Sequence, residues 1–217
     1  MIRIGITGHR PHRLKVSDSK LSARVASVLI GLMKADGKKP GSSTPCLDII
    51  SPLAEGCDRI VARQALALQQ RLTALLPFER GDYEATFGDA STTTEFRALW
   101  KASSERAVLK GLAKHAEASY VAVGMVTLAR CDVVLTIWDG KPAAGRGGTP
   151  EILQNALEWG IPIIWIDALK DRKPIVLLAK SRGKKPPQLD TAAKKAEPLT
   201  AALYREITII ARGTTSA

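Results

Sequence analysis

Three glycine-containing segments of the chain carry residues suited to binding an anion or a sugar. The first is GITGHRPHR, residues 5–13. Glycine allows a tight turn and a close approach of the backbone to a ligand, and a guanidinium can hold a phosphate through two parallel hydrogen bonds. We therefore predict phosphate contacts at Gly8 and Arg10. His9 is a weaker candidate for ligand binding, because a lone histidine in a loop is more often a structural hydrogen-bonding group than a base.

The second segment is SPLAEGCDRIVA, residues 51–62. Its candidate ligand contacts are Ser51, Glu55, Gly56 and Asp58. Gly56 is suited to the turn that leads into a helix, and Asp58 would lie in the first turn of that helix. An acid at this position also interacts favourably with the positive end of the helix dipole, so a purely structural role for Asp58 stays open.

The third segment is DGKPAAGRGGTPE, residues 139–151. Thr149 and Pro150 are typical of an N-cap and a first helical residue. Glu151 would then lie in the first helical turn, where the dipole alone favours an acid. A ribose phosphate ligand would account for both the glycines and the acids of this segment, whereas the dipole accounts for the acid alone. Its phosphate suits the glycine turn, and its sugar suits a carboxylate, Asp139 or Glu151. The predicted phosphate-binding residues of this segment are Gly147, Gly148 and Thr149.

Short apolar runs alternate with stretches of helical period, which predicts an α/β fold of Rossmann type. We expect an open parallel sheet of about five strands with helices on both faces. The expected strands are residues 3–8, 47–51, 72–78, 132–138 and 162–166, with an edge strand at 174–179. Ligands of such sheets bind beyond the carboxyl ends of the strands, where the strand order reverses. The three segments follow strands and should meet there.

The chain divides by charge into residues 1–169, the expected nucleotide-binding domain, and a basic extension, residues 170–217. The extension holds 11 of the 32 Lys and Arg residues and 4 of the 21 Asp and Glu residues. Its densest part, 180–187, is rich in Gly and Pro, which favours a solvated linker over a nucleic-acid contact. Leu199, Leu203, Ile207 and Ile210 recur at helical spacing. This helix either docks on the domain or pairs with a second copy in a homo-oligomer.

No apolar run approaches the ~20 residues that cross a bilayer, and the first residues do not resemble a signal peptide. We expect a cytoplasmic protein without a membrane partner. Cys46, Cys57 and Cys131 lack metal-site spacing and should be reduced, buried thiols; no metal or cofactor is expected. Residues 79–96 show no clear period and are long for a connection. We predict that they form a mobile lid over the strand ends, with a disordered surface insertion as the alternative.

Together these motifs resemble the SLOG superfamily of Rossmann-like domains over residues 1–167. GITGHR and SPLAEGCD followed by an apolar strand are similar to DNA processing protein A. The GGTPE turn is similar to the lonely guy enzymes, which are phosphoribohydrolases. The lonely guy motif places its glutamate three residues after the threonine, whereas Glu151 lies two after Thr149. No counterpart of that family's catalytic arginine motif is present.

The resemblance implies a nucleotide-related ligand and leaves three hypotheses. The leading one is binding or sensing of a nucleotide or an ADP-ribose derivative, in a bacterial conflict or signalling system. The second is an N-glycoside hydrolase of nucleoside monophosphates in which Glu151 is catalytic. The third is single-stranded DNA binding as in DNA processing protein A. The modest charge of residues 1–169 and the 5% aromatic content disfavour the third hypothesis. Whether the protein is an enzyme stays open at this point.

Overall fold

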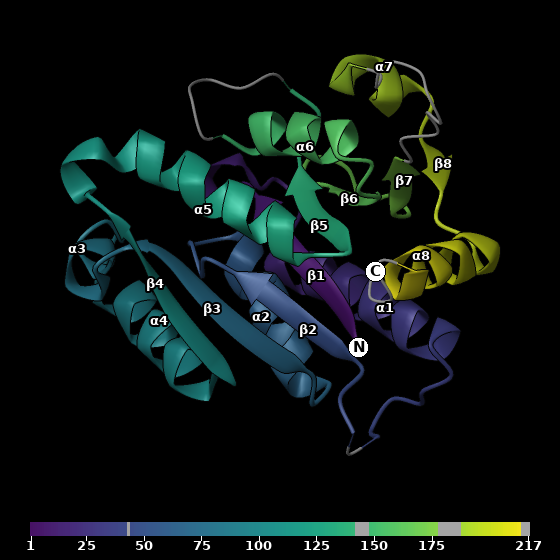
Figure 1. The fold of residues 1–217 in the computed structure, drawn as a ribbon, viewed down its shortest axis with the longest axis horizontal. Coiled ribbons are helices and arrows are strands. Elements are labelled where there is room, and N and C mark those ends of the chain that lie inside the picture. The colour runs from purple at the N-terminus through teal and green to yellow at the C-terminus, as the bar shows by residue number, and fades with distance from the viewer. Residues whose placement is uncertain (43, 142–147, 178–187, 214–217) are drawn as a thin grey trace.

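The computed structural model describes residues 1–42, 44–141, 148–177 and 188–213, and it is built around a single eight-stranded sheet (Figure 1). The strands lie in the order β4-β3-β2-β1-β5-β6-β7-β8. The first six of these are parallel, and β7 and β8 are each antiparallel to their neighbours. The strands are β1 (Ile2–Gly8), β2 (Leu47–Ser51), β3 (Arg71–Phe78), β4 (Glu105–Gly111), β5 (Val133–Trp138), β6 (Ile163–Asp167), β7 (Ile175–Leu177) and β8 (Glu197–Pro198). The predicted fold class is confirmed, with more strands than the five expected.

Helices cover both faces of the sheet. One core layer lies under α1 (Asp18–Ala35), α2 (Cys57–Ala67), α4 (Ala90–Ala102) and α8 (Ala201–Gly213). The other lies under α5 (Ala116–Arg130), α6 (Thr149–Glu158) and α7 (Leu189–Lys194). Figure 1 shows α5 and α6 in front of the sheet and α1 and α2 behind it. Short helices α3 (Arg80–Glu84), η1 (Pro11–Arg13) and η2 (Ala113–His115) connect these elements.

The strands that the sequence predicts best are buried on both faces. Every residue of β2 and of β5 is buried, so each strand reads as a nearly continuous apolar run. In β1, Ile2, Ile4 and Ile6 all point into the layer under α1 and α2. These burial patterns explain why the predicted bounds lie within a residue of the observed ones.

The edges of the sheet differ from the prediction. Strand β4 was not predicted, because it is an outer strand whose Arg106 and Lys110 are exposed and interrupt any apolar run. Strand β7 begins where the edge strand was expected, but it pairs with both β6 and β8 and is therefore not the edge. Residues 178–179 lie outside the described part of the chain.

Residues 79–96 are largely helical rather than irregular. They form α3 and the first half of α4, which Asp89 and Thr92 begin with a reciprocal capping box. Tyr83 lies 5.9 Å from Phe96 between ring centroids, and both side chains are buried. The segment therefore packs through its aromatic residues, and its movement as a lid on ligand binding stays a prediction.

The C-terminal helix α8 docks on the domain, the first of the two alternatives. Leu203 and Ile207 are buried in the same core layer as α1. The ring of Tyr204 fills the space that a side chain at Gly31 would need, and Arg212 pairs with Asp36 at 2.7 Å. The basic stretch 180–187 lies outside the described residues.

The three cysteines are free and buried, as expected. Within the described part of the chain, no helix has the length and apolar character needed to cross a membrane. The same residues contain no group of three or more His, Cys, Asp or Glu side chains that could hold a metal ion.

Candidate functional site

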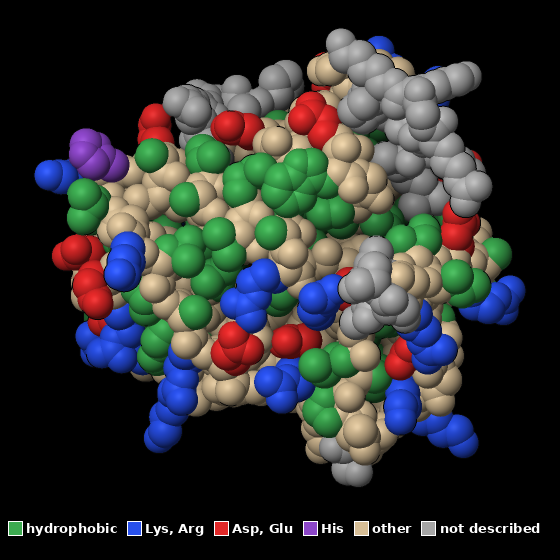
Figure 2. Space-filling view, viewed as in Figure 1, with side chains coloured by type: hydrophobic (Ala, Val, Ile, Leu, Met, Phe, Trp, Pro, Cys, Tyr) green, Lys and Arg blue, Asp and Glu red, His purple; other side chains and the backbone are tan. Residues whose placement is uncertain are grey.

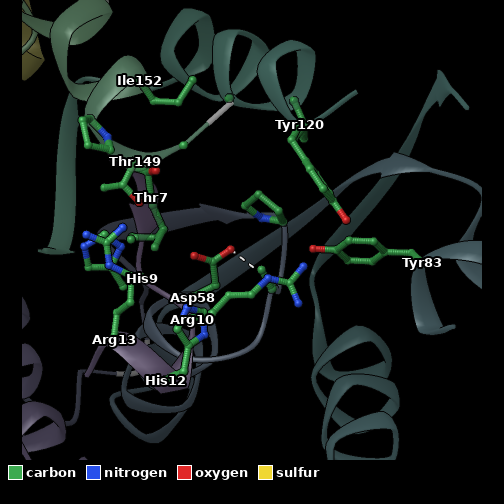
Figure 3. Close-up of a pocket in the computed structure, with 18 residues that line it drawn as sticks. Thr7, His9, Arg10, His12, Arg13, Asp58, Tyr83, Tyr120, Thr149 and Ile152 are labelled. Carbon is green, nitrogen blue, oxygen red and sulfur yellow. Dashed lines mark hydrogen bonds between the residues drawn. The ribbon is translucent and has the colours of Figure 1, made fainter. Parts of the chain in front are cut away.

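A pocket of about 340 Å³ lies beyond the carboxyl ends of the parallel strands. The strand order reverses at β1, which has β2 on one side and β5 on the other. The chain leaves these neighbouring strands toward opposite faces of the sheet, and this opens a crevice between the loops. Residues from the end of β1, from η1, α2, α3 and α5, and from the start of α6 line the pocket (Figure 3).

The structure brings together six of the residues predicted from the sequence. The predicted residues that line the pocket are Gly8, His9, Arg10, Asp58, Gly148 and Thr149. Five others do not line it: Ser51, Glu55, Gly56, Asp139 and Glu151. Gly147 lies outside the described residues.

Asp139 lies behind the pocket wall and holds two wall residues. Its Oδ1 is 2.8 Å from Nε2 of His9, and its Oδ2 accepts hydrogen bonds from Arg13 at 2.6 and 3.0 Å. Nε2 of His9 makes no aligned hydrogen bond within the described part of the chain, so this is a close polar contact rather than a well-formed hydrogen bond. Burial raises the pKa of Asp139, but His9, the Lys141 N–H and Arg13 outweigh it and lower that pKa to about 2. Asp139 therefore positions His9 and Arg13.

His9 is neutral at physiological pH. Its side chain is 5% exposed, and burial lowers its pKa below the ordinary value, although Asp139 acts in the opposite direction. Its backbone N–H donates to the carbonyl oxygen of Ile137 at 3.0 Å and so extends the pairing of β1 with β5. His9 thus contributes a neutral imidazole to the wall of the pocket.

Arg10, the predicted phosphate ligand, is partly neutralised within the protein. Its Nη1 lies 3.1 Å from Oε2 of Glu55. The other oxygen of Glu55 accepts a hydrogen bond from the Gly88 N–H, so Glu55 also ties the start of α2 to the loop before α4. Arg10 keeps 35% of its side chain exposed and lines the pocket, which leaves it able to contact a ligand.

Asp58 is the acidic residue among the described residues of the pocket wall. It is 4% exposed, and its Oδ2 accepts a hydrogen bond from the Ala54 N–H at 3.1 Å. Burial raises its pKa to about 7, against the opposing effects of the Ala54 N–H, Arg10, Arg59 and Ser51. The hydroxyl of Ser51 meanwhile accepts from the Leu53 N–H and supports the turn before α2. Asp58 can therefore exchange a proton near neutral pH.

Two of the predicted glycines are explained by packing. A Cβ at Gly8 would lie 2.5 Å from Cβ of Cys57 and 2.9 Å from the carbonyl oxygen of Ile137. Gly56 has φ of +89°, and a Cβ there would lie 2.5 Å from the carbonyl oxygen of His9. These residues let the start of α2 approach the end of β1. Their presence does not itself indicate a phosphate.

The start of α6 differs by one residue from the prediction. Gly148 is the N-cap, and Thr149 and Pro150 are the first two helical residues. Gly148 has φ of −76°, which other residues also adopt. Glu151 is half-buried, its N–H donates to the Gly148 carbonyl oxygen, and its own carbonyl oxygen accepts from the Asn155 side chain. With this helix phase Thr149, Pro150 and Ile152 line the pocket, and Glu151 does not.

The aromatic side of the pocket was missed by sequence reasoning. Tyr83 from α3 and Tyr120 from α5 line it, and Figure 3 shows their hydroxyl groups pointing toward one another. Burial raises the pKa of Tyr83 well above its ordinary value, so it stays neutral. Tyr83 lies in the segment 79–96 that we expected over the strand ends, but neither it nor Tyr120 was singled out, and the helices α3 and α5 that carry them were not predicted.

No protein-family model and no curated protein matches the chain. Two similar solved structures are DNA processing protein A from Helicobacter pylori and from Streptococcus pneumoniae. The first aligns with a TM-score of 0.50 at 13% identity over 89% of this chain, and the second with 0.51 at 15% over 92%. The chain has the Rossmann-like fold of DNA processing protein A. The resemblance expected from the sequence is thus confirmed for the fold.

The chain spans only part of these proteins, 72% of the length of the Helicobacter DNA processing protein A and 62% of the Streptococcus one. The Helicobacter structure is described as revealing a single-stranded DNA binding mode. At these identities the likeness shows the fold alone.

Proposed function

We propose that the protein binds a nucleotide-like phosphate ester in the pocket at the ends of β1 and β5. The observation that carries this proposal is the composition of the pocket wall at the reversal of strand order. Arg13 and the start of α6 line one side of the pocket, and Tyr83, Tyr120 and the Arg10 guanidinium line another. A volume of about 340 Å³ is at the lower end of the range for small-molecule pockets, which suits a ligand the size of a mononucleotide.

The phosphate would lie where the positive charge and the helix start are found. In Figure 3, His9 and Arg13 lie on the side opposite the two tyrosines, with Thr149 above them. Arg13 offers a guanidinium, and the N-terminus of the ten-residue helix α6 carries a partial positive charge. Arg13 is already paired with Asp139 and keeps 27% of its side chain exposed, so the proposed anion site combines this guanidinium with the start of α6.

The base would lie against Tyr83 and Tyr120. Apolar side chains of Pro52, Val123 and Ile152 complete this part of the wall. Aromatic side chains stack on nucleobases with little dependence on base identity. This arrangement supports a nucleotide over inorganic phosphate, because the apolar surface would otherwise have no function in binding.

A hydrolase of nucleoside monophosphates is the second candidate. The observation that favours it is a carboxyl group in the pocket wall, Asp58, whose pKa suits a general acid. A general acid works best when its pKa lies near the working pH, and burial raises the pKa of Asp58 to about 7. In such an enzyme Asp58, rather than Glu151, would be the acid that reaches the ligand. Release of a free base from a nucleoside monophosphate would test this candidate directly.

Single-stranded DNA binding is supported less than nucleotide binding, because of how the charged side chains are distributed over the described residues. On the face shown in Figure 2, Lys and Arg side chains are interspersed with Asp, Glu and hydrophobic side chains and form no continuous track.

Self-association through α8 would use its outer side, where Ile209 is 71% exposed, since Leu203 and Ile207 are buried against the domain.

The test measures binding of ribonucleoside and deoxyribonucleoside monophosphates. Thermal unfolding gives the stabilisation of the protein by each nucleotide, and calorimetry gives the dissociation constant. A ligand at 100 times its dissociation constant should stabilise the protein by about 2.7 kcal/mol. Arg13→Gln should weaken binding about tenfold or more, since it removes a charge-assisted hydrogen bond to phosphate. Arg10→Gln should have a smaller effect, because Figure 3 shows the Arg10 guanidinium on the Tyr83 side of Asp58, away from the proposed phosphate position. The control is Arg130→Gln, which removes an arginine paired with Glu105 outside the pocket. Unchanged melting temperatures with every nucleotide would contradict the proposal.

A further inference from the structure

We infer that Asp58 binds the sugar hydroxyls of the ligand and makes the pocket selective for ribonucleotides over 2′-deoxyribonucleotides. This inference rests on the proposed function and adds the class of ligand to it. It also assigns the sugar contact to Asp58 in place of Asp139 or Glu151, neither of which lines the pocket.

The position of Asp58 within the pocket is the first argument. Figure 3 shows its carboxyl group between the tyrosines and the side that carries His9 and Arg13. In a nucleotide the sugar joins the base to the phosphate. If the base lies on the tyrosines and the phosphate at the start of α6, the sugar must therefore pass Asp58.

The hydrogen-bonding capacity of Asp58 is the second argument. One carboxyl oxygen accepts from the Ala54 N–H, marked by the dashed line in Figure 3, and the Ser51 hydroxyl is a further polar neighbour. The second carboxyl oxygen lies on the side of Thr7 and Thr149. Asp58 is 4% exposed, and a buried acceptor gains from a partner that replaces lost water. Two neighbouring hydroxyls of a ribose are such donors, whereas a 2′-deoxyribose offers one fewer.

The charge state of Asp58 makes this selectivity depend on pH. The groups that act on it are Arg10 from the loop after β1, Cys57 and Arg59 from α2, Tyr83 from α3 and Ser51 from β2. Burial raises the pKa of Asp58 to about 7 despite the two arginines. Hydroxyl donors favour the ionised carboxylate, so ribose binding releases a proton, and the preference for ribose increases as the pH rises through about 7.

The experiment is calorimetric titration with the four ribonucleoside 5′-monophosphates and their 2′-deoxy counterparts at pH 5.5 and pH 8.5. The ligand phosphate also titrates near pH 6, but it does so equally in both members of each pair, so the affinity ratio isolates the sugar. We expect a ratio of roughly tenfold in favour of the ribonucleotide at pH 8.5, because hydrogen bonds to a charged group are the strong ones, and a several-fold smaller ratio at pH 5.5.

Asp58→Asn should remove the pH dependence of this ratio while keeping an acceptor for the Ala54 N–H. The matched control is Asp48→Asn, which changes a buried aspartate on β2 that accepts from the Thr73 hydroxyl outside the pocket. Should Asp58→Asn fail to fold, the pH profile of the wild-type ratio still decides.

The outcomes separate the inference from the proposed function. Ribonucleotides and deoxyribonucleotides that bind equally at both pH values overturn the inference and leave the proposed function intact. A ratio that keeps its pH dependence in Asp58→Asn also overturns the inference, because another group then recognises the 2′-hydroxyl. Absence of binding by all eight nucleotides overturns the proposed function, and the inference with it.

Discussion

Asp139 holds His9 and Arg13 with its two carboxyl oxygens, at 2.8 Å from Nε2 of His9 and 2.6 Å from Nη2 of Arg13. The contact joins the loop after β5 to the loop after β1, the two strands that flank the reversal of strand order. One buried carboxylate thus fixes the wall of the pocket on the side where we place the phosphate.

Asp139→Asn should destabilise the protein by roughly 2 kcal/mol at neutral pH, since a pKa lowered from 3.8 to about 2 corresponds to a free energy of this order. The native state holds the ionised form, so this stabilisation is present above the unfolded pKa of about 4 and is lost as the pH falls toward 2. Urea unfolding of both proteins should give a constant difference between pH 5 and 8 that shrinks below pH 4. A difference that grows on acidification would contradict the role given to Asp139.

Gly8→Ala should destabilise the protein by about 1–3 kcal/mol, because the new methyl group overlaps Cys57 and the Ile137 carbonyl oxygen. Gly81→Ala is the control, since its Cβ would meet nothing within 4 Å and it lies in helix α3. Chemical denaturation measures both. Equal stability of Gly8→Ala and wild type would show that Gly8 is not needed for the packing of α2 on β1.

Glu151→Gln should leave nucleotide affinity within about twofold and lower stability by at least the ~0.3–1 kcal/mol of an interaction with the helix dipole. The reason is its place in the first turn of α6 and outside the pocket wall. Calorimetry and thermal unfolding measure the two effects. If wild-type protein releases free base from a nucleoside monophosphate and Glu151→Gln does not, Glu151 is catalytic and this prediction is wrong.

Much of the fold could be predicted from the sequence because its central strands are buried on both faces. Strands β1, β2, β3, β5 and β6 read as apolar runs. Strand β4 is an exposed edge strand with charged residues. Helix α5 is apolar through most of its length, so its sequence shows no clear polar face. The sequence pattern alone does not predict such elements, because their place depends on the parts of the tertiary structure that they pack against.

The site could be predicted in part for a similar reason. Parallel strands end at one edge of the sheet, so the direction of the strands alone brings together the residues that follow them, such as His9, Arg10 and Asp58. Tyr83 and Tyr120 reach the same edge from helices on the faces, which requires knowledge of the tertiary structure. The direction of Glu151 depends on where α6 begins, and a shift of one residue turns each side chain by about 100° around the helix axis.

The lid hypothesis predicts that a saturating nucleotide slows amide hydrogen exchange in residues 80–87. Tyr83 belongs to both this segment and the pocket wall, so a ligand packed against its ring should suppress local opening of α3. Exchange of α8, which packs on α1 away from the pocket, serves as the internal reference. Unchanged protection of residues 80–87 in the presence of a ligand that binds by calorimetry would exclude a lid.

Asp58→Asn should stabilise the unliganded protein at alkaline pH and not at acidic pH. The folded pKa of about 7 lies above the ordinary value of 3.8, so the native state binds more protons than the unfolded chain between these values. Stability attributable to Asp58 is therefore complete below about pH 4 and declines as the pH rises to about 7. The amide cannot ionise, and we expect the variant to exceed the wild type by roughly 2–4 kcal/mol at pH 8, with a small difference at pH 4. Urea unfolding at the two pH values measures this effect. A variant that is less stable than the wild type at pH 8 would mean that the unliganded protein stabilises the ionised carboxylate. Asp58 would then be a structural residue, and not one that lowers the stability of the protein in order to bind a ligand.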